Sequence, residues 1–290
     1  MTSDELIAAL KIKGSFPSAD DLFSNADFLV LFNHQMQVEI IPTMQLLSEE
    51  YFLLTKDYTI TQGSTYRIPS RAIGAKCRDL QYLDGSNNLA PLNRLFEEDR
   101  PLNNSGYYLV RNSIELSSDF INGTLRMKYF ARPNKLVLES ACAQISSIDT
   151  GLNQVVVTAL PSTMSTGVLV DFIQAKNPYD LLAYDQTISG VSGTTVSFAS
   201  LPTDLAVGDW ISIAEQSCVP MVPEEMHPIL VQSALVSALS SKKDRAVDYE
   251  SKVLERIKQD AIRMLDPRVE NDSVSFKSGR LLSYFNTRWY

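Results

Sequence analysis

The spacing of apolar residues divides the chain into two helical parts with a long β part between them. Apolar side chains recur at helical spacing in the first 55 residues, where Ser18 with Asp21 and Ser24 with Asp27 resemble N-cap pairs. The very apolar stretch 28–40 predicts a long helix that Pro42 kinks or divides. Helical spacing returns after residue 222 and continues to Leu265, and Asp266-Pro267 ends it. In its second helix we expect Val253, Ile257, Ala261 and Met264 to face inward. The sequence therefore predicts that helices from both ends of the chain pack together.

Short runs of β-branched and aromatic residues between turn residues predict strands within residues 57–137. The clearest of these runs are 58–60, 66–68, 107–110 and 125–130. Asn122-Gly123 has the composition of a hairpin turn, because both residues tolerate positive φ. We expect these strands to form β hairpins beside the helices.

The middle of the chain contains an internal repeat. Residues 155–162 (VVVTALPS) are echoed by residues 196–203 (VSFASLPT), an offset of 41 residues. Each copy continues with a glycine six residues after its proline, Gly167 or Gly208, and then with an alternating strand. Neither copy can bury a face alone, so we expect the two tandem copies to pair into one small β-barrel or sandwich.

These patterns together predict an α+β fold. We expect a helical bundle of N-terminal helices and a C-terminal helix pair, with β hairpins and the inserted barrel or sandwich. The expected divisions are a core of residues 1–137 and 221–267, an inserted β domain at 138–220 and a C-terminal arm at 268–290.

The charge distribution supports a separate middle unit. The chain carries a net charge of −8, and residues 136–222 hold eight acidic residues against one basic residue, Lys176. The flanking segments are close to neutral. This segment is too acidic to bind nucleic acid well, because such binding requires basic side chains.

Several classes of protein are disfavoured by composition. The longest unbroken apolar runs have five residues, far short of the roughly 20 that a membrane span requires. Asp4 and Glu5 stand where a secretory signal carries basic residues. The cysteines are odd in number and widely separated, which favours buried thiols over a disulfide framework. We expect a chain without a membrane span that folds in a cytoplasm.

No group of residues has the spacing of a catalytic, cofactor or metal site. His34 and His227 lack a second histidine or cysteine at ligand spacing, so packing or capping is the favoured role for each. Paired acids such as Glu49-Glu50 and Glu224-Glu225 have the chemistry of a glycosidase, but adjacent acids on helices usually mark solvated faces or helix starts. We therefore expect no enzyme activity, no cofactor and no metal.

Two basic regions are candidate contact sites. Arg67, Arg71, Lys76 and Arg78 lie within twelve residues, and either contact phosphates or a partner's carboxylates, or form a solvated strand edge, which is favoured. The C-terminal arm combines aromatic and basic side chains, a composition that interface cores favour. Its candidate partner-binding residues are Phe276, Arg280, Tyr284, Phe285, Arg288, Trp289 and Tyr290. The arm either binds a partner or folds back on its own domain.

Four segments carry a resemblance to known proteins. Residues 66–74 (YRIPSRAIG), 123–134 (GTLRMKYFARPN), 207–211 (VGDWI) and 222–230 (VPEEMHPIL) resemble structural proteins of tailed bacteriophages. The late helix pair resembles the last helices of head-to-tail connector, or adaptor, proteins. The resemblance implies a virion protein of the neck that is assembled in the host cytoplasm. It implies that twelve copies form a ring beneath the portal protein, and that double-stranded DNA passes through this ring without sequence-specific binding.

The resemblance leaves the role of the acidic insertion open. It either lines the channel and keeps DNA from sticking, or faces outward and holds tail fibres. The partners that the resemblance implies for the chain are the portal protein and tail or nozzle proteins. Two other readings compete with the connector: a tail or baseplate component whose β module binds fibres or carbohydrate, and a hydrolase with paired carboxylates. The last is disfavoured because no pocket signature accompanies the acids.

Overall fold

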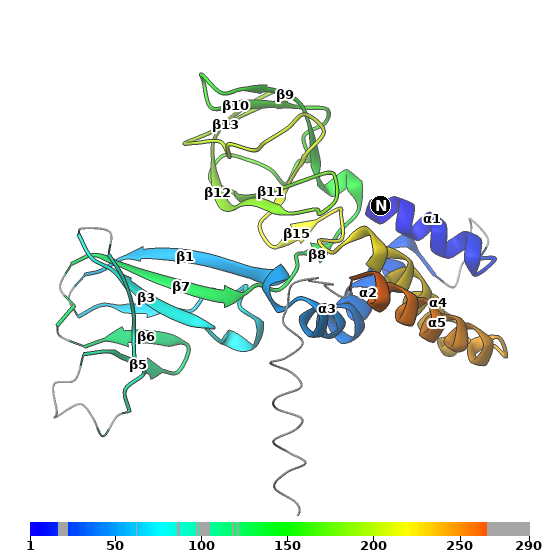
Figure 1. The fold of residues 1–290 in the computed structure, drawn as a ribbon. Helices are drawn as coiled ribbons and strands as arrows, with labels where there is room; N and C mark the ends of the chain where they lie inside the picture. Colours follow the sequence, from blue (N-terminus) through cyan, green and yellow to red (C-terminus); the bar gives the residue numbers. More distant parts are fainter. Residues whose placement is uncertain are drawn as a thin grey trace, which may run out of the picture.

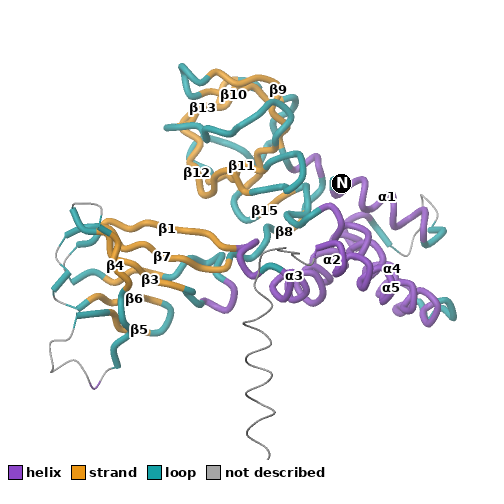
Figure 2. The backbone as a smooth tube through the Cα atoms, viewed as in Figure 1, coloured by secondary structure: helices purple, strands orange, loops and turns teal. Residues whose placement is uncertain are grey.

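The computed structural model describes residues 1–16, 23–61, 63–85, 88–96, 98, 105–117, 119–120 and 122–265. These residues form a mixed α+β structure with three parts: a helical lobe, a sheet lobe and a closed β-barrel (Figure 1). Figure 2 shows that helix dominates the first part and strand the other two. The predicted α+β class is therefore confirmed.

The helical lobe is assembled from both ends of the chain. Its α-helices are α1 (Ser3–Lys13), α2 (Asn25–Gln35), α3 (Ile41–Leu47), α4 (His227–Ser241) and α5 (Val247–Leu265). Leu6, Leu10 and Phe32 from the N-terminal helices and Leu230 and Leu235 from α4 share one buried core. Sequence-local signals start these helices, since Ser24 and Asp27 form the predicted capping box. The second predicted cap, Ser18 with Asp21, lies outside the described residues.

A π-helix (Met36–Ile40) joins α2 to α3 in one continuous row. Pro42 lies in the first turn of α3. It has no N–H to offer the carbonyl of Val38, so the α-helical pattern is interrupted just before it. The predicted division of the long helix at Pro42 is confirmed. We call the segment 25–47 the α2–α3 row.

The sheet lobe contains two small antiparallel sheets. One has the order β1-β7-β3-β4 and the other β2-β6-β5. Leu125, Met127 and Tyr129 of β7 alternate inward and are fully buried. The strands are β1 (Leu53–Thr59), β2 (Thr65–Arg67), β3 (Asp79–Leu83), β4 (Leu89–Pro91), β5 (Tyr107–Val110), β6 (Ser113–Leu116) and β7 (Thr124–Phe130).

The hairpin predicted at Asn122-Gly123 is wrong. Gly123 does adopt a positive φ of 114° just before β7. However, β6 pairs with β2 and β5, whereas β7 pairs with β1 and β3. The turn thus carries the chain from one sheet to the other. Turn composition reports the local backbone, but the partner of the following strand depends on the rest of the lobe.

The barrel is closed, with strand order β10-β13-β12-β11-β14-β9. Val155, Phe172, Val196 and Phe198 point inward and form its own core. Its strands are β9 (Ala143–Asp149), β10 (Gln154–Val157), β11 (Leu169–Ile173), β12 (Leu181–Ser192), β13 (Thr195–Phe198) and β14 (Trp210–Ile213). The sequence left barrel and sandwich open, and the structure selects the barrel.

The chain enters and leaves the barrel along one short parallel pair, β8 (Lys135–Leu136) with β15 (Gln216–Ser217). The exact domain limits, 1–137 with 221–267 against 138–220, stay a prediction. No helix among the described residues has both the length and the apolar character that crossing a bilayer demands.

Candidate functional site

The four basic residues of 67–78 do not act as one exposed group. Arg67, Lys76 and Arg78 are exposed on the sheet lobe, whereas Arg71 is only 4% exposed. Arg78 lies 3.7 Å from Glu50 and against the ring of Phe130. A role of the exposed three in binding phosphates or a partner stays a prediction. The expectation that Arg71 belongs to such a surface is corrected, because its charge is used inside the molecule.

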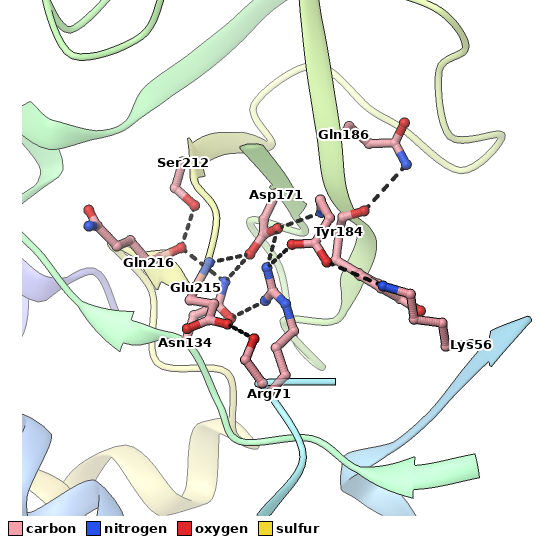
Figure 3. Close-up of polar contacts among 11 residues, drawn as sticks. Lys56, Arg71, Asn134, Asp171, Tyr184, Gln186, Ser212, Glu215 and Gln216 are labelled. Carbon is pink, nitrogen blue, oxygen red and sulfur yellow. Dashed lines mark hydrogen bonds and ion pairs between the residues drawn. The ribbon is translucent and has the colours of Figure 1, made fainter. Parts of the chain in front are cut away.

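Arg71 reaches from the sheet lobe to the barrel. Its Nη2 donates to Oδ1 of Asp171 at 2.8 Å and to Oδ1 of Asp185 at 2.9 Å, and its Nη1 donates to Oδ1 of Asn134 at 2.9 Å (Figure 3). The guanidinium also lies 5.6 Å from the ring centre of Tyr184. Burial alone would lower the pKa of Arg71, but the Asp171 and Asp185 carboxylates reverse this, and the net shift is upward.

Asp171 is the centre of this junction. Val170 and Phe172 point into the barrel, so Asp171, between them on β11, points outward. It is nevertheless fully buried, because the other lobes cover that face of the barrel. Its Oδ1 accepts from Arg71 and from the backbone N–H of Asp185, and its Oδ2 accepts from Nδ2 of Asn134 and the backbone N–H of Glu215.

Two of these donors require an unusual backbone. Asp185 has a φ of 54° and Glu215 a φ of 65°, both in the left-handed region that non-glycine residues seldom adopt. Both turn their backbone N–H groups onto the Asp171 carboxylate. Strained residues persist where surrounding contacts over-determine them, and here four charge-assisted hydrogen bonds on one carboxylate supply those contacts.

Contacts from the sheet lobe continue around the junction. Lys56 of β1 lies 3.9 Å from Oδ2 of Asp185 and over the ring of Tyr184, whose hydroxyl donates to the carbonyl of Thr55 at 2.9 Å. Ser70 donates to Oε1 of Glu215 at 2.7 Å. Burial raises the pKa of Tyr184, so this phenol remains a hydrogen-bond donor at neutral pH. We call Arg71, Asn134, Asp171 and Asp185 the Asp171 junction.

Two cavities flank the junction, of about 390 and about 400 Å³, and Arg71, Arg132 and Pro133 line both. The first opens between the α2–α3 row and the barrel, and it is also lined by Gln37, Lys135 and Glu215. The second is bordered by Phe52, Leu54, Leu182 and Asp204, among others. They mark the seams where the three parts meet.

Comparison with protein-family models and with curated proteins finds no match for this chain.

The remaining candidate residues fall into two groups. His227 is fully buried at the start of α4, with Nδ1 3.2 Å from the Met1 amine, and His34 is exposed on α2. All seven aromatic and basic candidates of the C-terminal arm lie outside the described residues. Within the described part of the chain, no three or more His, Cys, Asp or Glu side chains gather as a metal site would require.

The barrel exposes fewer unpaired acidic side chains than its sequence suggests. Asp171 and Asp209 are buried, and Asp209 accepts from the backbone N–H groups of Ala175 and Ala206. Asp185 is paired with Arg71 and Lys56. Glu215 accepts from Ser70, and Asp149 accepts from the backbone N–H groups of Gly151 and Leu152. At least five of the eight acids of 136–222 are therefore used within the molecule, in fixing backbone or joining lobes.

Sequence reasoning missed Asp171, Asn134 and Asp185. A signal for Asp171 was present: it interrupts the apolar strand Leu169–Ile173, and a carboxylate in such a strand needs a buried partner. The identity of that partner, 100 residues away in the chain, had no local signal.

Proposed function

We propose that this chain is a non-enzymatic structural protein of a tailed-bacteriophage virion, the head-to-tail connector subunit that forms a ring under the portal. In this role it joins capsid to tail and lets the double-stranded genome pass. The observation on which this proposal depends is the architecture. Helices from the N-terminal and C-terminal parts of the chain form one helical lobe, and two β parts are joined to it. This supports the helical-bundle-with-β-insertion plan that the resemblance implies.

The residues of the resemblance support the proposal further. Segment 66–74 contributes Arg71 to the Asp171 junction, and segment 123–134 contributes Asn134. Segment 222–230 begins α4, whose side chains meet α1 and α2 in the buried core. Two of the four similar segments therefore contribute side chains that fix the lobes to each other, and a third helps to form the helical core. A ring subunit requires such rigidity, since small errors of orientation accumulate around a closed ring.

We also propose that the barrel is built from two tandem copies, β9–β11 and β12–β14. The pairing supports this: Val155 lies opposite Val196, and Asp171 opposite Ser212. Each pair is separated by the 41 residues of the repeat. Antiparallel pairing of equivalent positions is what an approximate two-fold axis through the barrel requires.

Native mass spectrometry of the full-length chain tests the function, across a range of concentrations and with a portal ring added. Closed oligomers of one defined stoichiometry, dodecameric by the resemblance, are the expected result. A strict monomer under all of these conditions would overturn the proposal.

One observation favours a second candidate, a tail or baseplate component that binds fibres or carbohydrate through the barrel. The barrel has its own core and exposes Leu152 and Val207 on its loops. Exposed apolar side chains of this kind suit a ligand surface. Binding of glycans or fibre proteins by a 138–220 fragment would favour this candidate over the connector.

A further inference from the structure

The outward face of the α2–α3 row is almost free of charge. Residues 28–48 contain one acidic residue, Glu39, and no lysine or arginine. Glu39 is already paired, because Nζ of Lys258 in α5 lies 2.7 Å from its carboxylate. From Phe28 to Leu47 the row therefore offers solvent no unpaired carboxylate, ammonium or guanidinium group.

The exposed side chains of this face are uncharged, and three large apolar ones stand there beside His34 and Gln37. Val30 is 65% exposed, Val38 58% and Leu46 88%. On the opposite face Phe28, Phe32, Met36, Ile40 and Met44 are buried in the helical core. Charge depletion combined with exposed apolar groups is the composition that interface cores favour.

The neighbouring helix shows that this is not a property of the whole lobe. Helix α5 packs on α4 and contacts the α2–α3 row through Lys258. Eight of its 19 residues are charged, and most of them face outward. Two adjacent helices of one lobe thus have opposite surfaces: α5 has a solvated face, and the α2–α3 row has a face suited to a partner.

The chain itself contains a segment with matching chemistry. Residues 276–290 combine five aromatic side chains with Lys277, Arg280 and Arg288 and contain no acid. Large rings bury much apolar area against an uncharged surface, and arginine stems add to it while their charges stay in water. The segment follows Leu265, which packs against the helical core. Twenty-five residues then remain, with a reach of roughly 80 Å when extended, enough to cross to an adjacent subunit.

We propose that residues 276–290 of one copy bind the α2–α3 row of a second copy. This inference rests on the proposed ring function and names the two surfaces of the contact. Because helix row and arm are different surfaces, the contact is head-to-tail, the type that generates a closed ring when its rotation closes. The arm binds in trans, so each subunit provides one arm and receives another.

Photo-crosslinking of the full-length chain tests the contact. A photoreactive residue replaces Val38, which is 58% exposed, in one preparation and Leu152, a barrel-loop residue that is 65% exposed, in a control. Each is mixed with ¹⁵N-labelled wild-type chain. We expect light-to-heavy crosslinks from position 38 to peptides of 276–290, and at least tenfold fewer from position 152. Crosslinks from position 38 within one copy only, or to any other segment, would overturn the inference.

A matched pair of charge substitutions provides the second measurement. Val38→Glu places a charge on the row, and Leu152→Glu places one on the barrel. We expect Val38→Glu to reduce the oligomeric fraction at least tenfold with unchanged helical circular dichroism, and Leu152→Glu to leave both unchanged. If rings form and Val38→Glu leaves them intact, the inference fails while the ring function stands. If wild type forms no oligomer even with a portal, both fail.

Discussion

The Asp171 junction and the outward face of the α2–α3 row are both contact surfaces, but their side chains differ in burial and in charge. The junction is buried and charged: one carboxylate accepts four hydrogen bonds and holds parts that are distant in sequence. The row is exposed and nearly uncharged, with Val30, Val38 and Leu46 open to solvent. The polar groups of the junction bind one another within the chain, whereas no described residue covers Val30, Val38 or Leu46.

The two surfaces should therefore govern different properties: the junction the stability of one subunit, and the row the assembly of several. A buried charge without its partners is strongly destabilising, so a charged junction tolerates one arrangement of the lobes. An exposed apolar side chain costs a soluble subunit little, and becomes favourable once another molecule covers it. Changes at the junction should therefore alter the stability of one subunit, and changes at the row should alter assembly.

The largest expected effect on stability is at the junction. Asp171→Ala should lower the free energy of unfolding by about 3–5 kcal/mol, because it leaves Arg71, Asn134 and two backbone N–H groups without their acceptor. Urea titration followed by circular dichroism measures this loss.

Asp57→Ala is the matched control. Asp57 forms a bidentate pair with Arg126, but both side chains are partly exposed. Its removal should destabilise the chain far less, since solvent screens and replaces an exposed pair. Equal losses for the two variants would show that the junction does not hold the lobes together.

A second internal contact predicts a pH dependence. The buried His227 lies against Tyr179 of the barrel segment and the Met1 amine, and burial, followed by that positive charge, lowers its pKa to about 4. An unfolded histidine titrates near 6.5, so the unfolded chain binds the proton first and stability falls as the pH drops from about 6.5 toward 4. Between pH 7.5 and 5 the loss should be about 2 kcal/mol.

His227→Gln separates this effect from the titration of carboxylates. Stability measured from pH 7.5 to 5 should fall less in the variant than in wild type, by roughly that same ~2 kcal/mol. Parallel pH profiles would mean that His227 is not held neutral in the folded state.

The smallest effect on stability is expected at the exposed row and its proposed occupant. Truncation after Pro267 should leave the melting temperature of the isolated subunit nearly unchanged, because the arm binds in trans. Assembly should fail, with Arg288 and Trp289 among the costly single losses. Differential scanning fluorimetry and size-exclusion chromatography measure the two properties. A truncated chain that melts well below wild type would place the arm in the core of its own subunit.

Local signals in the sequence predicted the elements better than their partners. The Ser24–Asp27 cap, the division at Pro42 and the strand 125–130 each depend on neighbours within a few residues, and all three are present. Met264, expected inward from helical spacing, is 72% exposed, because Leu254 and Ala261 define the buried side of α5.

The junction could not be predicted in the same way. Arg71 stands among exposed basic residues in the sequence, and nothing nearby distinguishes it from Arg67 or Arg78. Its partners, Asp171 and Asp185, lie 100 and 114 residues away. The direction of the Arg71 side chain is set by where β11 and β12 pass, which depends on the complete fold.

Negative-stain electron microscopy of the full-length chain bound to its portal tests the central claim most directly. We expect end-on views of a closed ring with one rotational symmetry, in which the helical lobes of neighbouring subunits adjoin through the α2–α3 row. Single unassociated subunits in every field, with the portal present and at the highest attainable concentration, would contradict it.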